Sequence, residues 1–166
     1  VMAPFDPEVQ SGAVCAIVSA AEHLFGFAVF QEDQRALRIC EFQEDSHMSR
    51  SEALFLQVQP KSCCIQLADP EEHKKLTRVA ESCGVTLIDI KAADMRQVDV
   101  EQDLLKLLVD APDCGLGRHL EEQRRKQGMR ALATLLGHHA LLSEPANFCS
   151  CTLALYPLRS FMYLDK

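Results

Sequence analysis

Three short apolar runs near the start of the chain predict a β-sheet meander. They span residues 14–21, 23–30 and 36–42, are rich in β-branched and aromatic residues, and are separated by short polar segments. Runs of this length and composition are typical of strands, and short polar connections favour antiparallel neighbours. We therefore expect the first three strands to pair in an antiparallel order.

Helical and strand patterns then alternate. Ser49 and Glu52 have the spacing of a capping box, in which a hydroxyl and a carboxylate bind free N–H groups at a helix start. They predict a helix over residues 53–58 that ends before Pro60, followed by a strand over residues 63–67.

A second helix is indicated by signals at both of its ends. Asp69 is a suitable N-cap, Pro70 suits the first helical position, and Gly84 suits the C-terminal end. Between them, the apolar positions at helical spacing predict a buried stripe made of Leu76, Val79, Ala80 and Cys83.

The second half of the chain continues this alternation. We expect a strand over residues 85–90, a helix capped by Asp99 that runs through Val109, and a loop over residues 111–117. Residues 118–142 predict a helical region with a possible break at Gly128, and residues 151–156 a last strand. The predicted fold class is α/β, with a mixed sheet of five or six strands, antiparallel first and then parallel, and helices on both faces.

Composition agrees with a globular domain. The chain has 166 residues, of which 48% are hydrophobic and 25% charged, and this excludes disorder and a coiled coil. The net charge of -7 argues against a free-standing nucleic-acid clamp. The longest apolar stretch, residues 12–21, is half of the roughly twenty residues that a bilayer span needs, so we expect no membrane partner. The N-terminus has neither signal-peptide nor transit-peptide character and suggests a fragment of a longer protein.

The eight cysteines are too few for a disulfide scaffold. Most lie in apolar runs, so we expect reduced thiols in a cytosolic or nuclear protein, with Cys15, Cys40, Cys63 and Cys83 buried. The pair Cys149 and Cys151 is too closely spaced for a usual zinc knuckle. We therefore predict no metal site.

The predicted strand order is also that of ribonuclease H-like nucleases, which hold two magnesium ions with clustered carboxylates. The first strand offers no acid at its middle, and the nearby acids Glu22, Glu32 and Asp33 lie at turns. No phosphate-binding glycine loop of a common type is present, so we expect no catalytic residue and no cofactor in this chain. A nuclease with carboxylates from less obvious positions remains the alternative.

A local basic cluster lies in the predicted helical region after residue 117. Beside Glu121 and Glu122, it consists of Arg118, Arg124, Arg125, Lys126 and Arg130. Such a cluster on a helix can contact phosphate or an acidic partner, or can be a solvated face. An autonomous nucleic-acid-binding domain is therefore a third possibility.

Several stretches, in the correct order, resemble the connector domain (domain II) of MutS-type DNA mismatch repair proteins. They are CEF at 40–42, EALFLQVQPKSC at 52–63, KAAD at 91–94 with QDL at 102–104, LLSEPANF at 141–148 and MYLD at 162–165. Within that family, they are most similar to the subgroup of second eukaryotic MutS homologues, the subunit that the heterodimers share. Two prolines and the pair Ser11 and Gly12 predict a linker over 1–13. The resemblance implies a connector over 14–158 and the start of a link to the next domain over 159–166.

The resemblance also implies a function. The domain would be a ribonuclease H-like connector without nuclease residues, joining the mismatch-contacting and ATPase parts of a nuclear, DNA-dependent ATPase whose ATPase motif lies outside this chain. Expected partners are the other domains of the same protein, a second MutS homologue as heterodimer partner, a MutL-type protein, an exonuclease and mismatched DNA. The MutL-type contact is expected at exposed polar residues, namely Asp94, Arg96, Gln97 and Gln102.

Overall fold

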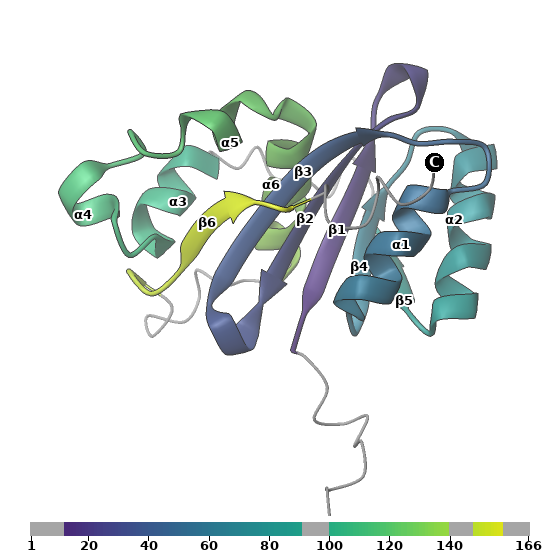
Figure 1. Cartoon of the computed structure of the whole chain (residues 1–166), viewed down its shortest axis with the longest axis horizontal. Helices are drawn as coiled ribbons and strands as arrows, with labels where there is room; N and C mark the ends of the chain where they lie inside the picture. The colour runs from purple at the N-terminus through teal and green to yellow at the C-terminus, as the bar shows by residue number, and fades with distance from the viewer. Residues whose placement is uncertain (1–11, 91–99, 140–147, 158–166) are drawn as a thin grey trace, which may run out of the picture.

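A six-stranded sheet forms the centre of the molecule, with the strand order β5-β4-β1-β2-β3-β6 (Figure 1). This computed structural model describes residues 12–90, 100–139 and 148–157. The strands are β1 (Val14–Ser19), β2 (Leu24–Gln31), β3 (Ala36–Gln43), β4 (Ser62–Gln66), β5 (Thr86–Asp89) and β6 (Thr152–Leu155).

The pairing of the strands confirms the predicted mixed sheet. β2 is antiparallel to both β1 and β3, which is the predicted meander. β4 is parallel to β1, β5 is parallel to β4, and β6 is parallel to β3. The order 3-2-1-4-5 with these directions is the ribonuclease H-like arrangement, and β6 extends it at the outer edge of β3.

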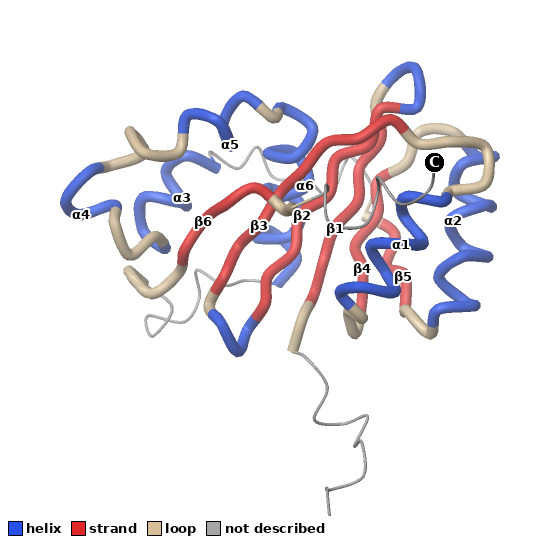
Figure 2. Tube along the Cα trace, in the orientation of Figure 1, coloured by secondary structure: helices blue, strands red, loops and turns tan. Residues whose placement is uncertain are grey.

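Helices cover both faces of the sheet, as predicted (Figure 2). α1 and α2 pack on one face, whereas α3 and α6 pack on the other. None of the described helices has the length and apolar character needed to cross a membrane. The helices are α1 (Ser49–Val58), α2 (Pro70–Cys83), α3 (Val100–Leu107), α4 (Ala111–Cys114), α5 (Leu120–Arg124) and α6 (Lys126–His139).

Burial on both faces explains why the first strand is apolar throughout. Cys15 and Ile17 belong to the core under α1 and α2, whereas Ala16 and Val18 belong to the core under α3 and α6. A strand covered on both sides alternates between two cores rather than between core and water. Its sequence is therefore a continuous apolar run.

Helix α6 approaches the sheet closely because two glycines leave room for it. A Cβ on Gly26 of β2 would lie 2.0 Å from the carbonyl oxygen of Gln127, and one on Gly128 would lie 3.3 Å from the carbonyl oxygen of Cys40. The predicted break at Gly128 is wrong: this glycine lies inside α6, and the break falls at Arg125, between α5 and α6. Gly128 serves packing rather than helix termination.

The predicted capping box at the start of α1 is also wrong. Ser49 is already helical, and the capping position is Met48, whose side chain makes no capping hydrogen bond. Two earlier carboxylates replace the box: Glu44 accepts from the Ser51 N–H at 2.8 Å, and Asp45 accepts from the Ser49 N–H at 3.0 Å. These acids precede the helix and fold back under its first turn, so the local spacing rule misses them.

The signals predicted for α2 are confirmed. The Asp69 carboxylate accepts from the Glu71 N–H at 2.9 Å, and Gly84 ends the helix with a φ of 75°. Leu76 and Ala80 are buried, whereas Val79 and Cys83 are half-buried beside the same core.

The connection after α3 contains more structure than predicted. The expected loop over residues 111–117 includes the short helix α4, which has Pro112 in its first turn. Asp99, the expected cap of α3, lies outside the described residues, as do most of the predicted terminal links.

Candidate interaction surfaces

The predicted partner surface is described at one residue. Gln102 is exposed on α3, on the side away from the buried Leu104 and Leu107. Asp94, Arg96 and Gln97 lie outside the described residues. This surface therefore stays a prediction.

The five basic residues are exposed but do not lie on one continuous helix. They are distributed over the segment before α5, the end of α5, the α5–α6 junction and the first turns of α6: Arg118, Arg124, Arg125, Lys126 and Arg130. Arg124 pairs with Glu121 at 3.0 Å. Arg130 donates to the Ser19 carbonyl oxygen at 3.3 Å. Part of the cluster therefore has a structural role, and the break at Arg125 divides the rest.

The start of α6 is stabilised from the sheet. A Glu41 carboxylate oxygen on β3 accepts a hydrogen bond from the Gln127 N–H at 2.6 Å. Unpaired N–H groups give a helix N-terminus a partial positive charge, so a carboxylate is favourable there. The available sequence signal is an acid between the apolar residues Cys40 and Phe42, but this signal does not indicate its partner.

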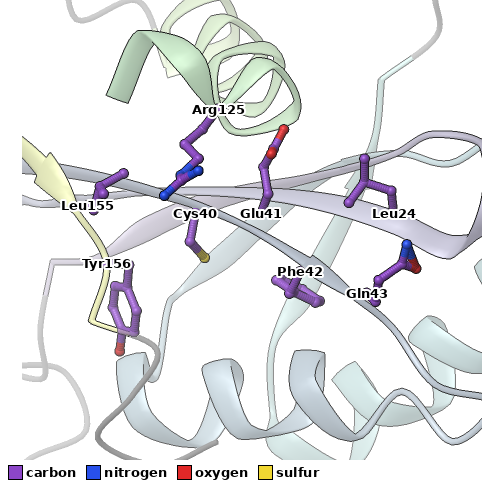
Figure 3. Close-up of a pocket in the computed structure, with 8 residues that line it drawn as sticks. All are labelled: Leu24, Cys40, Glu41, Phe42, Gln43, Arg125, Leu155 and Tyr156. Carbon is purple, nitrogen blue, oxygen red and sulfur yellow. The ribbon is translucent and has the colours of Figure 1, made fainter. Parts of the chain in front are cut away.

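A hollow of about 380 Å³ opens at the outer edge of β3, beyond the end of β6 (Figure 3). The ladder between β3 and β6 ends at the pair Ile39 and Leu155, and the Tyr156 N–H then donates to the Ile39 carbonyl oxygen at 2.8 Å. β3 itself continues to Gln43. The hollow lies along this continuation of β3.

On the α6 side of the sheet, the hollow combines apolar and charged groups. Leu24, Glu41 and Leu155 line it from the strands, and Arg125 reaches over it from the α5–α6 junction (Figure 3). Arg125 forms no ion pair with another described residue. Its guanidinium therefore remains available to an acidic group.

On the opposite side, the hollow is lined by Cys40, Phe42 and Tyr156 (Figure 3). The Tyr156 ring packs edge-on against Phe27, with ring centroids 5.8 Å apart. Burial, with a smaller effect of the Cys40 thiol, raises the pKa of the Tyr156 phenol to about 12. The hydroxyl therefore stays protonated at neutral pH.

His119, which is buried, joins the start of α4 to the start of α5. Its Nδ1 lies 2.8 Å from the Glu122 carboxylate, and its Nε2 lies 3.0 Å from the Asp110 carboxylate. His119 can satisfy both acids only when both ring nitrogens donate. Because all three side chains are mostly or fully withdrawn from water, we interpret this group as a structural clamp. Sequence reasoning missed it.

Five of the eight cysteines are buried packing residues. Cys15, Cys40 and Cys63 are buried free thiols, as predicted, whereas Cys83 is half-buried, so that prediction is corrected. Burial raises the pKa of Cys40 and Cys63 far above the usual range of a thiol, which keeps both protonated. Within the described segments, no three His, Cys, Asp or Glu side chains are grouped as metal ligands would be.

Comparison with known proteins establishes the family. The sequence model of the protein family MutS domain II matches residues 12–147 of the chain. The chain therefore belongs to the MutS domain II family, the connector domain of MutS-type DNA mismatch repair proteins, which confirms the resemblance found in the sequence.

Its relatives are of the MSH2 type. The chain is 31% identical over 136 residues to DNA mismatch repair protein msh-2 of Neurospora crassa. The aligned region covers 79% of this chain and 14% of that protein. It is 27% identical over 147 residues to MSH2 of Saccharomyces cerevisiae, covering 86% of the chain and 15% of the relative. The chain thus spans about a seventh of the length of these relatives.

Several solved structures match this chain, and one of them shows how low the similarity is. It is the nuclease domain of the large terminase subunit gp2 of bacterial virus Sf6, with a TM-score of 0.42 and 10% identity, over 86% of this chain and 63% of that one.

Proposed function

We propose that this chain is the non-catalytic connector of an MSH2-type mismatch repair protein. In that role it links the mismatch-contacting and ATPase parts and offers a surface to MutL-type and exonuclease partners. The observation that carries the proposal is the match to MutS domain II over residues 12–147. The whole protein would act in the nucleus, pair with a second MutS homologue, bind mismatched DNA and hydrolyse ATP outside this chain, which itself would need no cofactor.

The composition and placement of the strands support a non-catalytic role. The side chains of β1 are Val, Cys, Ala, Ile, Val and Ser. The nearby acids lie at opposite ends of β2: Glu22 in the turn before it (Ala21–His23), and Glu32 and Asp33 in the turn after it (Glu32–Gln34). β2 has eight residues and is therefore about 26 Å long, too long for these acids to share a pair of metal ions.

The two-sided packing supports a linking role. Close-packed interiors resist deformation, so a domain with helices buried on both faces of one sheet moves largely as a rigid body. A displacement imposed at one end is then transmitted to the other. This is the mechanical property that a connector between two active parts requires.

The partner surface is tested by replacing Arg96 and Gln97 together with alanine in the full-length protein. Exposed polar residues at a rim affect association more than folding, so thermal stability should be nearly unchanged. Recruitment of the MutL-type partner to mismatched DNA should weaken, and mismatch binding should be retained. Recruitment equal to the parent protein would contradict this placement and direct the search to the basic residues around Arg124.

The alternatives are tested on the purified chain. Magnesium-dependent cleavage of a nucleic acid would establish a nuclease and contradict the proposal. Tight DNA binding that falls steeply with salt would favour an autonomous nucleic-acid-binding domain. The proposal predicts neither result.

A further inference from the structure

On the outer edge of β3, the last four residues have no paired strand among the described residues. The Ile39 carbonyl oxygen points toward β6, where it accepts from the Tyr156 N–H. Main-chain groups alternate in direction along a strand, so the N–H and C=O groups of Glu41 and Gln43 point outward in the same way. Among the described strands, none lies beside β3 on this edge after Ile39.

The hollow next to this edge has room for the side chains of an added strand. Successive side chains of a strand point to opposite faces of a sheet. On the α6 side they would meet Leu155 and Arg125, and on the other side they would meet Phe42 and Tyr156 (Figure 3). The two faces of the added strand therefore favour different residues: an acidic side chain on the α6 side and an apolar side chain on the opposite side.

The charges near the hollow favour an acidic segment, although the whole chain carries -7. The Glu41 carboxylate is engaged by the Gln127 N–H, so it is compensated by the start of α6. Arg125 has no ion-pair partner among the described residues, and Lys126 follows it at the first turn of the helix. Two cations, Arg125 and Lys126, therefore lie near this edge beside one carboxylate that is already hydrogen-bonded.

We propose that the β3 edge from Cys40 to Gln43 binds an extended segment of a partner protein in which acidic and apolar residues alternate. The segment adds as a strand beyond the end of β6, places a carboxylate at Arg125, and lays apolar side chains against Phe42 and Tyr156. This is β-strand addition, in which main-chain hydrogen bonds provide affinity and alternate side chains provide specificity. It concerns a different surface from the predicted MutL-type contact and does not depend on the connector role.

The size of the edge sets the strength of binding. Four strand residues span about 13 Å and provide two outward N–H and two outward C=O groups. Such a small contact is typical of a weak and transient complex. We expect a short peptide to bind with a dissociation constant on the order of 0.1 to 1 mM.

A designed peptide tests the proposal on the isotope-labelled chain by NMR. The probe is the blocked heptapeptide Ac-TVEVEVT-amide, which presents valines on one face and glutamates on the other. We expect saturable shifts of the amides of Glu41 and Gln43, with slower hydrogen exchange at both. Two matched peptides are the controls: Ac-TVKVKVT-amide reverses the charge, and the probe N-methylated along one edge keeps its side chains but cannot pair. Both should bind at least about tenfold more weakly.

Variants of the chain separate the two contributions. Arg125→Ala should lower the affinity for the glutamate probe roughly three- to tenfold. Arg118 is exposed and does not line the hollow, so Arg118→Ala should leave this affinity unchanged. Gln43→Pro removes an outward N–H at an edge, where proline is tolerated, and should abolish binding. The Arg125 variant and the N-methylated peptide keep the test decisive if the proline variant does not fold.

Several outcomes would overturn the proposal. One is the absence of a chemical shift change at the Glu41 and Gln43 amides with 5 mM probe, about five times the weakest expected dissociation constant. Another is that the lysine peptide or the N-methylated peptide binds as tightly as the probe. Concentration-dependent pairing of the chain with itself through this edge, seen by sedimentation, would show that a second copy is the occupant. That result would also overturn it.

Discussion

Replacing Glu44 by alanine tests how α1 is held in place. The Glu44 carboxylate is 6% exposed and accepts hydrogen bonds from the Arg50 N–H at 3.2 Å, the Ser51 N–H at 2.8 Å and the Ser51 hydroxyl. It therefore caps the first turn from a position before the helix. The capping box suggested by Ser49 and Glu52 is not formed.

The expected cost follows from these contacts. A hydrogen bond to a charged group contributes about 1.5–3 kcal/mol, and loss of a helix cap costs about 0.5–2 kcal/mol. Ser51 is fully buried, so the alanine variant leaves its N–H and hydroxyl without this acceptor. We expect a loss of about 3 kcal/mol in the free energy of unfolding, which corresponds to a fall in Tm of about 6–12 °C for a chain of this size.

Urea unfolding followed by circular dichroism at pH 7 measures the effect. Ser49→Ala is the matched control and should change stability by less than about 0.5 kcal/mol, because its hydroxyl is not at the capping position and donates to the exposed Asp45 carboxylate, where a lost hydrogen bond costs little. Glu44→Gln, which keeps acceptor oxygen but loses charge, should fall between the two. A Ser49→Ala variant as unstable as Glu44→Ala would refute the reasoning and restore the capping box.

Three further predictions concern packing, thiols and pH. Gly26→Ala should cost about 3 kcal/mol or prevent folding, as read from thermal melts, because its Cβ would lie 2.0 Å from the Gln127 carbonyl oxygen; a melt like the parent's would contradict this. At pH 8, a thiol reagent should label exposed Cys149 before Cys64, whose pKa burial raises to about 12, and peptide mass spectrometry would reveal the opposite order. Burial raises the pKa of the Tyr156 phenol in the folded chain to about 12, whereas an exposed tyrosine has a pKa of 10.0. The contribution of the neutral phenol to the free energy of unfolding is therefore complete below pH 10 and is lost as the pH rises toward 12. Tyr156→Phe should therefore make urea midpoints fall less over that range, and an equal fall would count against it.

Elements whose signals are local could be predicted from the sequence. The three strands of the meander are apolar because both of their faces are buried. α2 begins at Asp69 and Pro70 and ends at Gly84, and each of these residues acts within one turn of its position. These patterns of sequence neighbours therefore transfer to the structure, whereas the capping box of Ser49 and Glu52, which is also local, does not.

Features that depend on distant contacts could not be predicted in this way. Glu41 caps α6 across 86 positions of sequence, and nothing near either residue indicates the other. Glycine weakens helices, so the sequence predicts a break at Gly128, but the role of this residue is to let α6 approach Ile39 and Cys40. Only the assembled sheet shows which helix lies over which strand.

The hollow at the β3 edge belongs to the second group. It exists because β6 pairs with β3 only as far as Ile39, whereas β3 continues to Gln43. The sequence predicts the basic cluster as one group, but in the structure the break at Arg125 brings that residue to the hollow, while Arg124 and Arg130 bind neighbouring groups. Sequence identified the charge but not its location in the fold.

The most direct test of the connector role measures energetic coupling in the full-length protein. Mismatch affinity is measured with and without ATP, and ATP affinity with and without mismatched DNA, because coupling between two sites is reciprocal. Glu44→Ala, which loosens α1 within the connector, should move both coupling factors toward one while leaving each affinity measured alone unchanged, and Ser49→Ala should alter neither. Coupling factors that stay at the parent value in a Glu44→Ala protein whose domain is measurably destabilised would contradict the proposal that this domain relays the state of one site to the other.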